Sequence, residues 1–252
     1  MAHPRFDHAV IVVSNLRRAV AEFESQGFRV RLGGRTGPVH NALVIFRDGT
    51  YLELTTTRFL AARVALRALG WTGALDRIAR RRNDIFERFI PWLGAAVGPI
   101  DWCIRVDNLA SVTRQLRHAG FDMFDPRSFE RTRPDGQVAR WRLGGPRNRR
   151  LPFFIEDETP IEVRIPGVES AFHENGAVGI RTLELPDQVA ADVTTMVNAL
   201  APQLGSDPLE NIPLSPSDAR DVFAVQLVTT GQPIDLDTTK TSSTRIQMRR
   251  AP

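Results

Sequence analysis

Four polar side chains interrupt stretches that otherwise have the apolar, β-branched composition of buried strands. His8 lies in the strand predicted at residues 6–13, and Glu53 lies in a second apolar stretch. Asp101 and Glu156 stand in two further apolar stretches in the second half of the chain. Burying a charged or polar group is costly unless it is paired or bound to a metal. These four residues are therefore the first candidates for chemistry.

An internal repeat connects them. Residues 11–28, IVVSNLRRAVAEFESQGF, resemble residues 104–121, IRVDNLASVTRQLRHAGF, at an offset of 93. A self-similar unit of this length indicates duplicated structure. Two duplicated halves are expected to meet around a shared cavity.

The repeat assigns the four residues to equivalent places. His8 falls on Asp101, and the aromatic, aliphatic and glutamate triplet at 51–53 recurs at 154–156. Each copy would contribute one polar residue from its first strand and one carboxylate from its last. A two-fold arrangement of the copies would then bring all four side chains together.

The chemistry of this set favours a metal. One imidazole and three carboxylates suit a hard divalent cation such as Mn²⁺, Fe²⁺ or Mg²⁺. Cys103 is the only cysteine, which excludes a thiolate-rich zinc site. Two other interpretations stay open. One is an incomplete or metal-free polar cluster, and the other is a core His8 hydrogen-bonded to Glu53, with the remaining acids at strand ends.

Local signals predict the elements that carry these residues. Residues 1–57 read as a strand, a helix stopped by Gly27, a second strand, and a hairpin turned at Asp48-Gly49. Residues 98–160 repeat the order of strand, helix and strands. Each unit is therefore predicted to be a βαβββ module.

The rest of the chain is less regular. Residues 58–97 are predicted to be mostly helical, with apolar residues alternating with arginines. They form a connector packed on the sheet, a lid over a ligand cavity, or a surface for a membrane or a partner. Residues 161–252 are predicted to hold a partial third module, with strands at 178–185 and 223–229. The tail from Thr238 is expected to be loosely ordered.

Five further residues are candidates for lining a ligand pocket, and each has a structural alternative. His40 and Asn41 begin a predicted strand and could equally stand at its edge. His173 could cover the mouth of a cavity or belong to a turn. Trp102 and Phe154 are aromatic residues in strands, where the default role is core packing.

The sequence resembles the glyoxalase-like domain branch of the vicinal oxygen chelate superfamily over residues 6–185. The resemblance is carried by five segments in this order: FDHAVIVVSNL, NALVIFRDGTYLEL, RTRPDGQVARWRL, LPFFIED and HENGAVGIRTLEL. It implies an α+β fold in which tandem βαβββ modules form a cup-shaped mixed sheet around a small ligand. The helical insertion and the partial third module would be additions to this cup.

The resemblance also implies a metal site. In metal-using relatives the ligands lie on the first and last strands of each module, which map here onto His8, Glu53, Asp101 and Glu156. A metal held there chelates two neighbouring substrate oxygens and stabilises an enediolate or similar oxyanion. Glyoxalase and extradiol dioxygenase sites have His or Gln where this chain has Asp101. Several members of the superfamily have lost the metal and only bind a small molecule.

Two functions are consistent with these expectations. The first is a divalent-metal-dependent lyase or isomerase of the glyoxalase type, acting on a small metabolite with adjacent oxygens. In that function Glu53 or Glu156 would shuttle a proton as the catalytic carboxylate. The alternative is a metal-free protein that binds or sequesters a small molecule.

Composition and charge limit the partners and the cellular location that we expect for the protein. The 252 residues carry a net charge of +4, and no apolar stretch approaches the length of a membrane span. Acidic residues are interspersed among the arginines, which argues against nucleic acid as a partner. A single cysteine and the lack of a secretory signal predict a cytoplasmic location. A homodimer is expected by analogy with the superfamily, whose cups are often paired across dimers.

Overall fold

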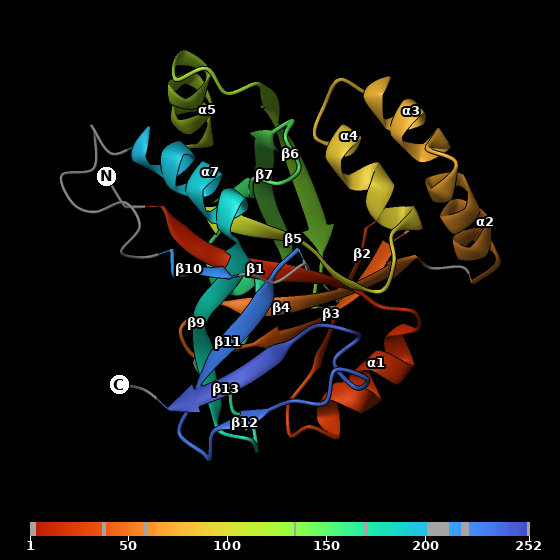
Figure 1. Ribbon diagram of the computed structural model, residues 1–252, viewed down its shortest axis with the longest axis vertical. Coiled ribbons are helices and arrows are strands. Elements are labelled where there is room, and N and C mark those ends of the chain that lie inside the picture. The colour runs from red at the N-terminus through yellow and green to blue at the C-terminus, as the bar shows by residue number, and fades with distance from the viewer. Residues whose placement is uncertain are drawn as a thin grey trace.

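Two antiparallel strands, β1 (Arg5–Val12) and β5 (Gly98–Arg105), form the centre of the larger sheet (Figure 1). The computed structural model describes residues 4–36, 39–57, 60–133, 135–168, 171–200, 212–217 and 222–250. Strand β1 pairs in parallel with β4 (Tyr51–Thr57), and β5 pairs in parallel with β8 (Phe153–Asp157). The eight strands have the order β2-β3-β4-β1-β5-β8-β7-β6, and the edge strands β2 and β6 contact each other because the sheet curls strongly. The predicted α+β fold of paired βαβββ modules is confirmed.

The repeated residues cap and stop the same helix in both modules. Asn15 accepts a hydrogen bond from the backbone N–H of Arg18 at 3.1 Å, and Asn108 accepts one from Ser111 at 2.8 Å. Gly27 and Gly120 end the two helical segments with φ angles of 81° and 89°, which favour glycine. The remaining module elements are α1 (Leu16–Glu24), β2 (Arg31–Thr36), β3 (Val39–Ile45), α5 (Leu109–His118), β6 (Met123–Thr132) and β7 (Val138–Pro146).

The pairing of β1 with β5 locates the pseudo-two-fold axis. Ala9 lies opposite Trp102, which is also its equivalent at the 93-residue offset, so the axis passes through this pair. His8 and Val10 lie opposite Cys103 and Asp101 and share one face of the sheet with them. We call this the inner face, and the face that carries Ala9 and Trp102 the outer face.

The described part of the connector has four helices, and the last two of them lie over the inner face. The four are α2 (Leu60–Trp71), α3 (Ala74–Arg80), α4 (Phe86–Phe89) and the 3-10 helix η1 (Ile90–Gly94). Phe89 and Trp92 pack against an apolar cluster of Val10, Cys103 and Phe153 on that face. On the outer face, α1 and α5 pack into one core that extends to the smaller sheet.

The smaller sheet has the order β10-β9-β11-β13-β12. Its strands and helix are β9 (Ala177–Pro186), α7 (Asp187–Asn198), β10 (Leu214–Ser217), β11 (Ala224–Thr229), β12 (Ile234–Asp235) and β13 (Ile246–Arg250), and they follow the short helix α6 (Ile161–Arg164). Strand β9 is parallel to β10 and antiparallel to β11, and β11 is parallel to β13. The central pairing of the large sheet therefore recurs in reduced form.

The C-terminal tail departs from expectation. Residues from Thr238 were expected to be loosely ordered, but β13 pairs with both β11 and β12. Ile246 and Met248 are buried in the shared core, where burial of apolar surface stabilises the strand. None of the described helices is long and apolar enough to cross a membrane.

Candidate functional site

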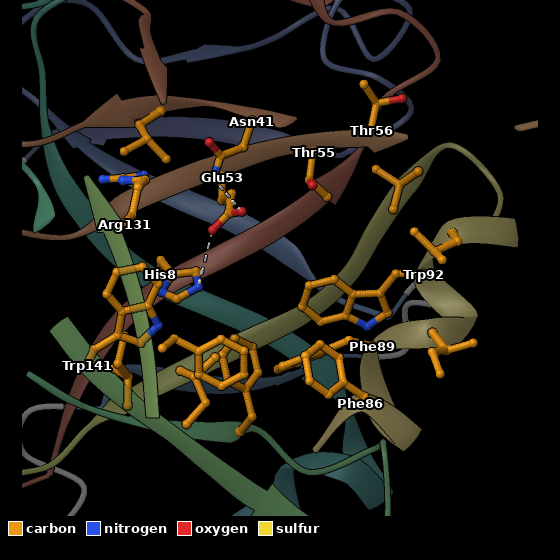
Figure 2. A pocket seen from close by; sticks show the side chains of 18 of the residues that line it. His8, Asn41, Glu53, Thr55, Thr56, Phe86, Phe89, Trp92, Arg131 and Trp141 are labelled. Carbon is orange, nitrogen blue, oxygen red and sulfur yellow. Dashed lines mark hydrogen bonds and ion pairs between the residues drawn. The ribbon is translucent and has the colours of Figure 1, made fainter. Parts of the chain in front are cut away.

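A cavity of about 490 Å³ lies between the inner face of the large sheet and the connector helices α4 and η1 (Figure 2). Its volume is in the range of small-molecule sites. Most of its wall is apolar, and the aromatic part comprises Phe86, Phe89, Trp92, Phe129, Trp141 and Phe153. The polar part is smaller and gathers His8, Asn41, Tyr51, Glu53, Arg131 and Arg164. An apolar enclosure with a few converging polar groups is typical of a ligand site.

A bulge in β1 gives His8 its acidic partner. Phe6 lies opposite Ile104 and His8 opposite Cys103, so Asp7 is an extra residue in the strand. Nδ1 of His8 lies 2.7 Å from Oδ1 of Asp7, and both side chains are buried. An aspartate in a regular strand would point to the opposite face from the next residue.

Asp7 is an ionised acceptor held by a buried network. Burial opposes its charge, but Arg164 and the hydrogen bond from His8 keep the pKa of Asp7 far below its ordinary value. Arg164 donates to Oδ1 and Oδ2 of Asp7 at 3.1 and 2.9 Å, and to the hydroxyl of Tyr51 at 2.8 Å. It also pairs with Asp157 at 2.6 and 2.9 Å. A carboxylate can only accept, so Nδ1 of His8 carries the hydrogen.

The other nitrogen of His8 faces the cavity. Nε2 lies 3.7 Å from Oε2 of Glu53, while Oε1 of Glu53 accepts a hydrogen bond from Asn41 at 2.8 Å (Figure 2). The His8 ring stacks on Tyr51, with centroids 4.5 Å apart, and meets the edge of Phe153 at 5.5 Å. In the neutral form of the ring, the hydrogen on Nδ1 leaves Nε2 as a lone-pair acceptor beside the carboxylate of Glu53. This arrangement can take a proton from a ligand in the cavity.

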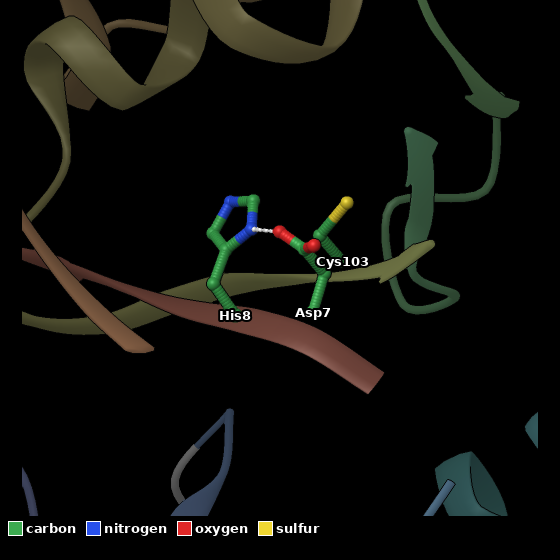
Figure 3. A group of neighbouring side chains, drawn as sticks. All are labelled: Asp7, His8 and Cys103. Carbon is green, nitrogen blue, oxygen red and sulfur yellow. Dashed lines mark hydrogen bonds and ion pairs between the residues drawn. The ribbon is translucent and has the colours of Figure 1, made fainter. Parts of the chain in front are cut away.

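The ligand atoms of Asp7, His8 and Cys103 lie within 4.8 Å of one another (Figure 3), the one such group of three or more among the described residues. Their spacing alone would let them contact one metal ion. Their chemistry fits an ion poorly, because Asp7 is already paired with Arg164 and bonded to His8. Burial raises the pKa of the Cys103 thiol well above its ordinary value, which opposes formation of the thiolate that a metal would bind. We therefore assign Asp7 to orienting His8.

The second module does not complete the predicted metal site. Asp101 stands at the position equivalent to His8, but Arg88 of α4 binds both of its oxygens at 2.7 and 2.6 Å. Arg88 is fully buried and also donates to the carbonyl oxygens of Pro146 and Leu151. The carboxylate of Asp101 therefore fastens the connector to the sheet.

Glu156 lies on the outer face, away from His8 and Glu53. Glu53 pairs with Val10, and Phe153 pairs with Cys103, the equivalent of Val10, so Phe153 is the structural equivalent of Glu53. The similar triplets of the sequence are three residues out of this register, and an odd shift reverses the face of a strand. Glu156 instead accepts a hydrogen bond from the backbone N–H of Leu109 at 3.0 Å, at the start of α5. The structure thus brings His8 and Glu53 together, whereas Asp101 pairs with Arg88 and Glu156 caps α5.

The five predicted pocket residues divide in the same way. Asn41 lines the cavity, whereas Trp102 and Phe154 belong to the buried core on the outer face. His40 alternates with Asn41 along β3 and shares the outer side with Ala42. His173 is buried between Phe28 and Phe46, outside the cavity.

His173 has a structural role that its hydrogen bonds define. Its Nδ1 accepts from the N–H of Arg29 at 2.9 Å, so Nε2 carries the hydrogen and donates to the carbonyl of Ile45 at 3.0 Å. Burial lowers the pKa of His173, which keeps the ring neutral. The ring joins the segment before β9 to the first module.

Several residues of the candidate site were not among the candidates that the sequence indicated. Asp7 is adjacent to His8, and two consecutive polar residues in an apolar strand were a usable sign of a bulge. Arg88 and Arg131 gave no such sign, since each stands near several other arginines, and the single arginine of the segment 151–180, Arg164, lies in no motif.

Comparison with known proteins agrees with this architecture. A family model described as glyoxalase-like domain matches residues 6–201, and the chain belongs to this family, within the vicinal oxygen chelate superfamily that the resemblance indicated. The crystal structure of a hypothetical protein from Staphylococcus aureus is similar over 98% of this chain and 100% of that chain, with a TM-score of 0.70 and 15% identity. Methylmalonyl-CoA epimerase from Mycobacterium tuberculosis is similar over 61% of this chain and 86% of that chain, with a TM-score of 0.38 and 15% identity. A comparison with curated protein sequences finds no match.

Proposed function

We propose that the protein binds a small oxygen-bearing metabolite in the cavity and moves a proton on it, as an isomerase or lyase does. One observation supports this function above the others. Asp7 fixes His8 through Nδ1 at 2.7 Å, and Nε2 faces the cavity 3.7 Å from Glu53. A base whose tautomer and orientation are set by a buried aspartate is the arrangement that general base catalysis uses.

In the proposed step, Nε2 of His8 takes a proton from a carbon next to a carbonyl group. The electron pair of the broken C–H bond forms the C=C bond of an enolate, and the carbonyl π pair moves onto its oxygen. Asp7 and Glu53 stabilise the resulting imidazolium by opposite charge. Return of the proton to a neighbouring atom gives an isomer, and expulsion of a leaving group from the next carbon gives a lyase product.

The connector supports this chemistry by enclosing the base. Phe89 and Trp92 lie on the side of the cavity opposite Glu53 (Figure 2). Apolar walls exclude water and strengthen the charge interactions inside. We therefore propose that the connector serves two of its expected roles, as a segment packed on the sheet and as a cover of the cavity.

The test is proton exchange in D₂O. A panel of 2-oxo acids, 2-hydroxy ketones and 2-hydroxy aldehydes is incubated with the protein, and loss of C–H signals is followed by proton NMR. We expect exchange on at least one class, and His8→Gln to slow it by about 10²- to 10⁴-fold because the base is lost.

The matched control is His118→Gln, which changes an exposed histidine at the end of α5 and should leave the rate unchanged. Equal rates in wild type and His8→Gln, or no exchange with any of the three classes, would reject the proposal.

A metal-free binding protein is the second candidate. The second module favours this function, because Asp101 is already paired with Arg88 and the apolar Phe153 stands at the position equivalent to Glu53. In that case small ligands would raise the Tm of the protein. The NMR experiment would then show binding without exchange.

A further inference from the structure

Arg131 differs from the other arginines that line the cavity. Arg164 is paired with Asp7 and Asp157, and Arg82 is paired with Asp84 at 3.1 Å. Arg131, on the edge strand β6, donates to the carbonyl oxygen of Arg164 at 2.8 Å and has no carboxylate within 4.0 Å among the described residues. The cavity wall thus presents one guanidinium that forms no ion pair within 4.0 Å with the described residues, although the charge of Glu53 acts on it from a greater distance.

The neighbouring Glu53 does not supply the missing partner. Its Oε1 accepts from Asn41, and its Oε2 lies nearest to Nε2 of His8. Burial lowers the pKa of Arg131, which reflects the cost of holding this charge away from water, while Tyr51 and Glu53 act in the opposite direction. A guanidinium keeps its charge at neutral pH, and its planar donors match a carboxylate in a two-bond arrangement.

The place of Arg131 in the cavity relates it to the base. Figure 2 shows its side chain on the same wall as Glu53 and His8, with Phe89 and Trp92 across the cavity. A ligand that pairs with Arg131 would present its adjacent atoms to His8 and place an apolar body against the aromatic wall. A neutral ligand would leave the guanidinium unpaired in this enclosure.

We propose that the ligand is a small carboxylic acid with an apolar or aromatic body, and that Arg131 binds its carboxylate. This inference rests on the proposed function, because it assigns the substrate class of the same cavity. Trp141 and Phe129 stack on each other beside Arg131, with centroids 6.4 Å apart, and give the body of the acid a further apolar contact.

The test compares acids with their uncharged amides. Binding of phenylacetate, 3-phenylpropionate and hexanoate, each against its primary amide, is measured by isothermal titration calorimetry on the full chain. We expect at least one acid to bind more tightly than its amide. Arg131→Gln should weaken that acid by about 10- to 100-fold and leave the amide unchanged, because a charge-assisted pair is lost.

Two further variants serve as controls for this experiment. Arg131→Lys keeps the positive charge and should retain part of the preference for the acid, which a merely structural role for Arg131 would not predict. Arg140→Gln removes an exposed arginine of the adjacent strand β7 and should change nothing. Equal affinity for acids and amides, or an acid preference that survives Arg131→Gln, would overturn the inference.

Because this experiment measures binding without turnover, its outcome is separate from that of the exchange experiment. An Arg131-dependent acid preference without proton exchange would keep this inference and reject proton transfer. Exchange on neutral ketones with no acid preference would keep proton transfer and reject this inference.

Discussion

The two modules of the large sheet have the same fold but use equivalent positions differently. In the first module, His8 and Glu53 face the cavity. In the second, Asp101 stands in the place of His8 and is bound by Arg88, while Phe153 stands in the place of Glu53 and packs against the His8 ring. Duplication provides two equivalent sets of positions. The positions of the first module line the cavity, and Asp101 of the second module binds Arg88 of α4, one of the helices that cover the cavity.

The largest expected effect comes from breaking the second set. Arg88→Leu leaves the carboxylate of Asp101 buried without a partner, so we expect the free energy of unfolding to fall by about 3–5 kcal/mol. The double variant Arg88→Leu/Asp101→Leu should recover most of this loss, because no buried charge remains. Urea denaturation measures both.

Arg82→Leu is the control in the same connector. Its ion pair with Asp84 is partly exposed, and its loss should cost less than about 1 kcal/mol. Equal losses in the single and double Arg88 variants would show that the packing of the arginine, and not its charge, holds the connector.

The same substitution in the two modules sharpens the comparison. Glu53→Gln removes the charge that faces Nε2 of His8, and we expect proton exchange to slow by about tenfold or more. Glu156→Gln leaves exchange unchanged and lowers the free energy of unfolding by about 0.5–2 kcal/mol, because the N-terminal turn of α5 loses a charged acceptor. Proton NMR measures the exchange rate of each variant, and urea denaturation measures the free energy of unfolding of each. A slower exchange in Glu156→Gln would contradict the assignment of this residue to the outer face.

Metal ions have the smallest expected effect. Mn²⁺, Fe²⁺, Mg²⁺ and EDTA should each leave the Tm unchanged, since Arg164 pairs with Asp7, Arg88 pairs with Asp101, and Phe153 offers no ligand atom. Thermal denaturation with and without each ion checks this. A rise in Tm with Mn²⁺ that EDTA reverses and that His8→Gln abolishes would show that His8 and Glu53 suffice as a metal site.

Much of the fold could be predicted because local signals and the global repeat agree. Asn15 and Asn108 cap the first turn of the equivalent helices by the same side-chain hydrogen bond. Gly27 and Gly120 end these helical segments with a positive φ in both copies. The expectation that His8 and Glu53 come together agrees with the structure, where β1 and β4 are parallel neighbours and Glu53 pairs with Val10, on the same face as His8.

The register of β8 could not be predicted from the triplet match. Strands β6 and β7 have 10 and 9 residues, against 6 and 7 in β2 and β3. The second module is therefore longer before β8 than the first module is before β4. No local sequence signal shows how many residues are inserted, so the alignment of β8 with β4 stays undetermined. The matching triplet at 154–156 lies three residues beyond the positions that are structurally equivalent to 51–53, and there its acid faces the other side of the sheet. Nor does the sequence show which connector arginine turns inward, because that depends on the position of Asp101 in three dimensions.

The extra residue in β1 has a consequence for how such a site can be gained or lost. Pairing with β5 continues on both sides of Asp7 as it would if that residue were absent. A single codon inserted or deleted there could therefore add or remove the partner of the imidazole, while every neighbouring side chain keeps its orientation toward core or cavity. If the proposed function holds, a pocket with an oriented base and a pocket that only binds differ by one inserted residue in the same sheet.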